Sequence, residues 1–122
     1  MGNRFDFSRA DRVRKALMRE VSEIIRRQIK DPRLTNEVIS ITDVEVSGDL
    51  RHAKLFVSIF GPAEKQEEIM EILAEWTPQV RSEIGKRIRL HHTPEIQFLM
   101  DISLERGSRV TSLLDQISRG EV

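Results

Sequence analysis

The side chains best suited to chemistry are few in this chain, and their spacing builds no catalytic site. Among 122 residues there are three histidines, no cysteine and no tyrosine. The lack of cysteine excludes thiol nucleophiles, disulfides, iron–sulfur clusters and thiolate zinc sites. His91 and His92 are neighbours, so they cannot face one metal in the i,i+4 manner of a helix, and His52 begins a predicted strand. We predict that the chain is not an enzyme and needs no metal or cofactor.

Three other features have an ordinary structural interpretation. The carboxylates of Glu67, Glu68 and Glu71 have no base or metal ligand near them in sequence, so they are typical of a solvated helix face. Gly85-Lys86 lacks the preceding glycines of a phosphate-binding loop. Trp76 is most simply a core side chain beneath a kink, with base stacking as the alternative.

The distribution of charge is more informative than its sum. Twenty basic and twenty acidic residues cancel, but residues 1–35 contain ten Lys or Arg against five Asp or Glu, and residues 36–80 contain three against nine. Residues 81–92 are basic again, with four against one. This sorting predicts a polarised surface.

The spacing of apolar residues predicts the first half of the fold. A helix begins after a capping-box-like Ser8 and ends at Asp31-Pro32. Two strands follow, Val38–Val46 and His52–Phe60, joined by a turn at Ser47-Gly48-Asp49. The apolar positions of the first strand change phase across Thr42-Asp43, which predicts a bulge.

The second half is predicted to be helical around one strand. A helix begins near Glu64 and is interrupted at Thr77-Pro78, where Thr77 is expected to cap a third helix that Thr93-Pro94 ends. A strand, Glu95–Asp101, and a last helix, Leu104–Ser118, complete the chain.

The order α-β-β-α-α-β-α predicts one α+β domain over residues 1–122, with its core at about 8–118. A strand, a helical crossover and a further strand make a parallel pair. We therefore expect a three-stranded mixed sheet with His52–Phe60 in the centre and helices on one face. No membrane span or signal peptide is evident, so a cytoplasmic protein is expected.

Helical geometry gathers the charges by sign. Lys86 and Arg89 point outward on the third helix, and Arg81 and Arg87 flank its apolar face. The first helix has a basic stripe opposite its apolar stripe: Arg12, Lys15, Arg19, Arg26 and Lys30. The second helix has an acidic stripe: Glu64, Glu67, Glu68, Glu71 and Glu75. Because one-signed stripes repel themselves and phosphate is the natural partner of Lys and Arg, the basic faces favour nucleic-acid backbone binding.

Two motifs carry a family resemblance. The hairpin contains V-S-x-D-L-x-x-A-K, and the third helix contains R-S-x-x-G-K-x-x-R-L. In order and spacing, the stretches Ile41–Ser58 and Arg81–Phe98 resemble the bacterial ribosome-binding factor A family, and Ser8–Leu34 and Asp101–Ile117 also fit. The resemblance implies a type II KH-like fold and a non-enzymatic assembly factor. Such a factor would bind the free or immature small (30S) subunit, and not assembled ribosomes, through 16S rRNA.

The resemblance also implies support of rRNA maturation, including the 5′ end, and of growth in the cold; we expect a monomer when free. One departure concerns the link between the paired helices. KH domains clamp RNA with a Gly-x-x-Gly loop there, and the family has an Ala-x-Gly kink, but this chain has Trp76-Thr77-Pro78. Flanking side chains must then carry more of the binding. The expected RNA contacts are Arg81, Lys86, Arg87, Arg89, Arg51 and His91, followed by Arg12, Lys15 and Arg19.

Two other functions stay open from the sequence. One is a protein–protein adaptor that uses the acidic helix or an exposed sheet edge. The other is a general single-stranded RNA-binding KH-like domain, which the missing Gly-x-x-Gly loop makes less favourable.

Overall fold

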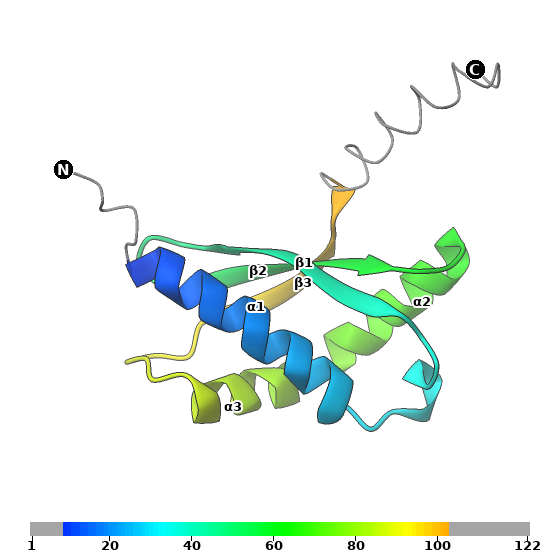
Figure 1. Cartoon of the computed structure of the whole chain (residues 1–122), viewed down its shortest axis with the longest axis horizontal. Helices are drawn as coiled ribbons and strands as arrows, with labels where there is room; N and C mark the ends of the chain where they lie inside the picture. Colours follow the sequence, from blue (N-terminus) through cyan, green and yellow to red (C-terminus); the bar gives the residue numbers. More distant parts are fainter. Residues whose placement is uncertain (1–8, 103–122) are drawn as a thin grey trace, which may run out of the picture.

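In the computed structural model, which describes residues 9–102, helices pack on one face of a small mixed sheet (Figure 1). The helices are α1 (Arg9–Arg27), the short 3-10 helix η1 (Pro32–Leu34), α2 (Ala63–Glu75) and α3 (Thr77–Arg87). The strands are β1 (Ile39–Val46), β2 (His52–Ile59) and β3 (Glu95–Met100). This order confirms the predicted α+β fold. The predicted last helix, Leu104–Ser118, lies outside the described residues.

The sheet has the order β1-β2-β3, with β1 antiparallel and β3 parallel to the central β2. The register shifts between Ile41 and Asp43, which confirms the predicted bulge. The bulged residue, Thr42, uses its hydroxyl to bond the Phe56 carbonyl and the carboxylate of Asp101, the residue after β3. The bulge therefore connects the edge strand to the chain leaving the opposite edge.

The core lies between the sheet and the helices. Strand β2 alternates strictly, with Ala53, Leu55, Val57 and Ile59 buried, as a strand covered on one face should. The helices contribute the residues that their apolar spacing predicts: Val13, Leu17, Val21 and Ile24 from α1, Ile69, Ile72 and Leu73 from α2, and Val80 and Ile84 from α3. No helix in the described part of the chain is long and apolar enough to cross a membrane.

Two helices end earlier than predicted. Helix α1 ends at Arg27, because the amides of Gln28 and Ile29 both bond the Ile24 carbonyl and the turn unwinds before Pro32. Helix α3 ends at Arg87, and Ile88 is extended. The prediction that Arg89 lies on the third helix is therefore wrong: Arg89 belongs to the loop that leads to β3.

Candidate nucleic-acid interface

The two basic helices, α1 and α3, lie side by side below the sheet (Figure 1). Arg87, in the last turn of α3, connects them. Its NH1 group lies 3.1 Å from Glu20 and 2.7 Å from Glu23 of α1, and its Nε lies 3.4 Å from Glu83 of its own helix. The Arg87 side chain is only 21% exposed. The sequence predicted a phosphate contact here; the structure shows a staple between two helices.

This staple uses the acids that dilute the basic face of α1. Hydrogen bonds, first from Arg87 and then from Arg19, hold the pKa of the Glu20 carboxyl below its ordinary value. The carboxylates of Glu23 and Glu20 in turn raise the pKa of Arg87. Arg87 thus offsets part of the negative charge of Glu20, Glu23 and Glu83 between the helices. The charged side chains of α1 and α3 that are exposed are all basic, so cations dominate the outer surface.

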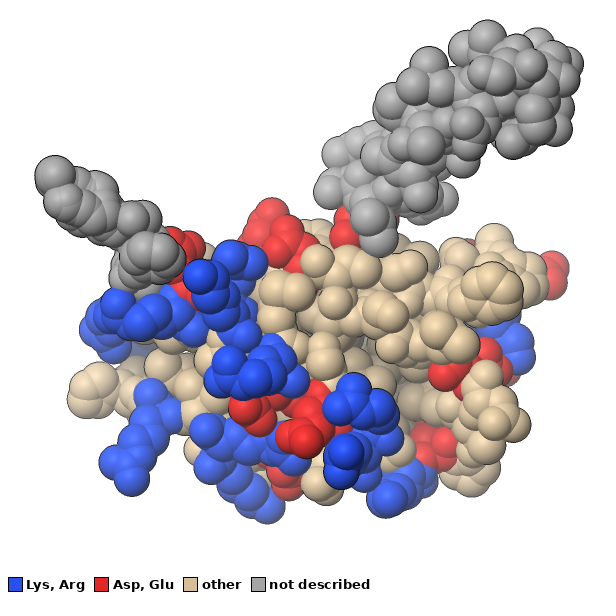
Figure 2. All heavy atoms as spheres, in the orientation of Figure 1, with Lys and Arg blue, Asp and Glu red and all other residues tan. Residues whose placement is uncertain are grey.

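The exposed cations gather over α1 and the end of α3, as Figure 2 shows at the left and lower left of the molecule. On α1 and beside it the exposed basic residues are Arg9, Arg12, Lys15, Arg19, Arg26, Arg27 and Lys30. Lys86 is 70% exposed although its Nζ lies 3.4 Å from Glu83, and Arg19 is equally exposed beside Glu20. The acidic stripe predicted on α2 is also exposed, but α2 lies on the opposite side of the molecule from the end of α3 (Figure 1).

Arg81 positions the loop between α3 and β3. Its Nε and NH2 groups donate to the carbonyls of Pro94 (3.0 Å) and Thr93 (2.8 Å), and NH2 lies 3.5 Å from Glu95. One turn later, a Cβ atom at Gly85 would stand 2.9 Å from the Thr93 hydroxyl. The loop can therefore pack on α3 only because residue 85 has no side chain.

That loop completes a basic cleft of about 370 Å³ at one end of the sheet. Arg51 of the hairpin turn and His91 of the loop, two of the expected RNA contacts, both line it. Arg9 and His92 line it as well. The one carboxylate of the cleft, Asp49, accepts hydrogen bonds from the Ser47 hydroxyl and the Arg51 amide. These bonds, the hydroxyl first, lower the pKa of Asp49.

The kink between α2 and α3 consists of one residue. Trp76 has φ −88° and ψ 0°, its amide bonds the Ile72 carbonyl, and its own carbonyl accepts from the Val80 amide. The prediction that Thr77 caps α3 is wrong. With Trp76 at the boundary, Thr77 is already helical, and its hydroxyl donates back to the Leu73 carbonyl at 3.2 Å. Pro78 stands in the first turn, where its missing amide costs no helical bond.

Trp76 packs against the core, as predicted, and also closes the kink onto the segment after α1. Its indole Nε1 donates to Asp31 Oδ2 at 2.8 Å. The same carboxylate receives two side-chain bonds from Arg33, which also reaches Glu75 at 2.8 Å. The bonds from Arg33 and then from Trp76 lower the pKa of Asp31 strongly.

The structure thus sorts the predicted site residues into two kinds. Lys86 and Arg89 lie exposed at the end of α3, Arg12, Lys15 and Arg19 on α1, and Arg51 and His91 in the cleft. Arg81 and Arg87 have intramolecular partners. The sequence did not lead us to predict Arg9 or His92 as site residues. Arg9 lies three positions before Arg12, so helical i,i+3 spacing could have identified it as part of the same basic surface.

The fold is a KH-like domain of type II: a helix, a hairpin, two helices joined at a kink, and a strand parallel to the centre of the sheet. Its cationic surface lies over α1 and α3. The model of the family described as "Ribosome-binding factor A" matches residues 9–114. The chain is 57% identical over 114 residues to ribosome-binding factor A of Gloeobacter violaceus, covering 93% of this chain and 88% of that protein. This chain belongs to the ribosome-binding factor A family.

Solved structures agree with the fold. A Thermotoga maritima relative determined by NMR is 32% identical, with a TM-score of 0.69, over 76% of this chain and 87% of that one. A homology model of the Thermus thermophilus ribosome-binding factor A, as fitted into a cryo-EM map of a 30S complex, has a TM-score of 0.57 and 23% identity over 70% of this chain and 88% of that one.

Proposed function

We propose that this protein binds the free or immature small (30S) ribosomal subunit through 16S rRNA and assists its late maturation, including processing of the rRNA 5′ end. The observation that carries the proposal is the surface of α1 and α3, on which the exposed charged side chains are all basic while Glu20 and Glu23 are drawn into ion pairs with Arg87. The Thermus relative fitted into a 30S complex supports the same partner. The protein would act in the cytoplasm as a monomer, without catalysis, and would support growth in the cold.

We assign the phosphate contacts to the exposed cations. Lys86 and Arg89 come first, the cleft with Arg51 and His91 second, and the exposed row Arg12, Lys15 and Arg19 on α1 third. Arg81 and Arg87 hold the loop and the helices that present these cations. Because the contacts are to phosphate, binding should depend strongly on salt and weakly on base sequence.

Co-sedimentation of the purified chain with small subunits, large subunits and assembled ribosomes, at low and high salt, tests the proposal. We expect salt-sensitive pelleting with free small subunits alone. Pelleting with no ribosomal particle at low salt would contradict it, and equal pelleting with assembled ribosomes would contradict the preference for free subunits.

A further inference from the structure

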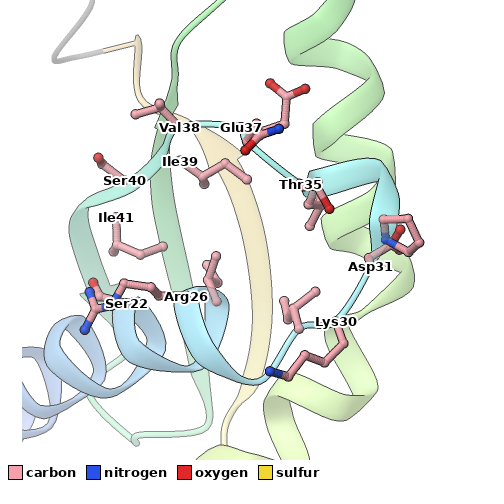
Figure 3. A pocket seen from close by; sticks show the side chains of 15 residues that line it. Ser22, Arg26, Lys30, Asp31, Thr35, Glu37, Val38, Ile39, Ser40 and Ile41 are labelled. Atoms are coloured by element: carbon pink, nitrogen blue, oxygen red, sulfur yellow. The ribbon is translucent and has the colours of Figure 1, made fainter.

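A groove of about 980 Å³, whose lining side chains are drawn in Figure 3, shares no lining residue with the basic cleft. It runs between the second half of α1, the segment that follows α1 and the first half of strand β1. Five half-buried aliphatic side chains line it: Ile25, Ile29, Leu34, Ile39 and Ile41. Among residues 9–102, no aromatic ring lines it, so these residues provide no platform on which single-stranded nucleic acids stack their bases.

The groove borders an open sheet edge. Strand β1 has β2 on one side and no neighbouring strand on the other within the described residues. The Phe60 amide donates to the Val38 carbonyl at 3.0 Å. Because hydrogen bonds alternate along an antiparallel ladder, the backbone groups of Ile39 and Ile41 point away from β2, toward the open edge.

Only this part of the edge is unprotected. Proteins guard edge strands with charged side chains and bulges, and β1 has both from the bulge onward, where Asp43 and Glu45 are exposed. The stretch before the bulge, residues 38–41, has no charged side chain. The unprotected stretch is therefore the one that lines the groove.

The acids of the groove are already paired, so its two rim cations have no carboxylate of the groove to bind. Asp31 accepts bonds from Arg33 and the indole of Trp76, and Glu37 lies 3.0 Å from the Lys65 ammonium. On the rim, Arg26 and Lys30 are exposed, and neither has an ion-pair partner among the described residues. The surface thus combines aliphatic side chains, backbone donors and acceptors, and two available cations.

We propose that this groove, named here the β1 groove, docks an extended segment of a partner protein that carries both apolar and acidic side chains on the one face that meets α1. The segment adds a fourth strand at Ile39 and Ile41. Its apolar side chains pack on Ile25 and Ile29, and its carboxylates pair with Arg26 and Lys30. Arg26 and Lys30 continue the exposed cations of α1, but none of the residues assigned to phosphate contact lines the groove, and the proposal goes beyond the proposed function.

The test is an NMR titration of the ¹⁵N-labelled full chain with the peptide Ac-Val-Thr-Glu-Thr-Val-Thr-Glu-Thr-Val-NH2, which places its valines and glutamates on one face of the strand. We expect shifts and slower hydrogen exchange at the amides of Ile39 and Ile41. A peptide with Lys in place of Glu should not bind. A peptide with its central valine replaced by proline should bind at least about tenfold more weakly, because proline donates no ladder bond.

Charge variants of the protein complete the test. Arg26→Glu and Lys30→Glu should each weaken the acidic peptide about tenfold. Lys54→Glu, an exposed reversal on strand β2, is the matched control and should leave the affinity unchanged. Three results would overturn the proposal: no shift at Ile39 and Ile41, affinity indifferent to the two rim reversals, or displacement of the peptide from these amides by oligouridine of equal length.

Discussion

The guanidinium group of Arg87 lies among three carboxylates, and this arrangement changes how a basic motif should be understood. The sequence places Arg87 beside Lys86, as if both served one ligand. In the structure, Lys86 is exposed, whereas Arg87 turns between α1 and α3. A cation that pairs with Glu20 and Glu23 offsets part of their negative charge, and so makes the potential of the surface more positive without itself contacting phosphate.

Replacing Arg87 with Gln should lower the melting temperature and flatten its dependence on pH. The folded pKa of Glu20 is lowered from 4.5. Its contribution to stability is therefore present above that value and is lost as pH falls through the lowered pKa. Thermal unfolding from neutral pH to below pH 4.5 should show a steeper loss for the original chain than for Arg87→Gln. Lys86→Gln is the matched control, and parallel curves for Arg87→Gln and the original chain would contradict the staple.

Gly85 matters through contact distance. Alanine favours a helix interior over glycine by about 1 kcal/mol, but its Cβ would stand 2.9 Å from the Thr93 hydroxyl. We expect Gly85→Ala to displace the loop and weaken small-subunit binding several-fold. Adding Thr93→Ala should restore binding and leave the protein more stable than the original chain. If Gly85→Ala binds small subunits as tightly as the original chain in co-sedimentation, the prediction is contradicted, because the loop then accommodates the added Cβ atom without loss of binding.

At the scale of elements, the carboxylate of Asp31 fastens the segment after α1 to the kink before α3. It receives bonds from Arg33 of η1 and from the indole of Trp76. The kink therefore has its own support, made by side chains 45 positions apart in sequence. This contact explains how a bulky Trp-Thr-Pro link keeps the geometry that the family resemblance assigns to small residues.

We expect Asp31→Ala to lower the melting temperature and shift the fluorescence emission of Trp76, the only tryptophan in the chain. The reason is that a partly buried indole N–H loses its acceptor. Glu75→Ala, which removes only the other partner of Arg33, is the control and should leave the emission unchanged. Identical spectra for Asp31→Ala and the original chain would contradict the contact.

The elements themselves could be predicted from the sequence because their patterns are local. The change in phase of the apolar positions between Ile41 and Val44 indicates the bulge. The alternation of Ala53, Leu55 and Val57 with polar residues indicates the central strand. The ends of helices were harder. Helix α3 ends at Arg87, and the loop that follows packs back with Thr93 beside Gly85, a long-range contact that no local spacing reveals.

The site could be predicted only as a list of cations. Helical periodicity identifies which side chains leave the apolar face, so the exposure of Lys86, Arg12 and Lys15 was foreseeable. It does not give the distance between two helices. The partners of Arg87, and the cleft that joins Arg9 to His92, arise when segments far apart in sequence meet.

At the scale of the whole molecule, the formal net charge is zero, but the charges of opposite sign lie on different parts of the surface. The cations gather over α1 and the end of α3 (Figure 2), and exposed carboxylates follow α2. Such a molecule should approach a polyanion with one face and turn the other away. The central claim is that the face of α1 and α3 binds rRNA phosphates.

The most direct measurement is co-sedimentation of two charge-reversal variants with small ribosomal subunits, after circular dichroism has shown both to be folded. The account predicts that Lys86→Glu with Arg89→Glu weakens binding by about a hundredfold, because two phosphate contacts become repulsive. Glu67→Lys with Glu71→Lys, the matched reversal on α2, should bind as the original chain does. Unchanged binding by the first variant, or loss of binding by the second, would contradict it.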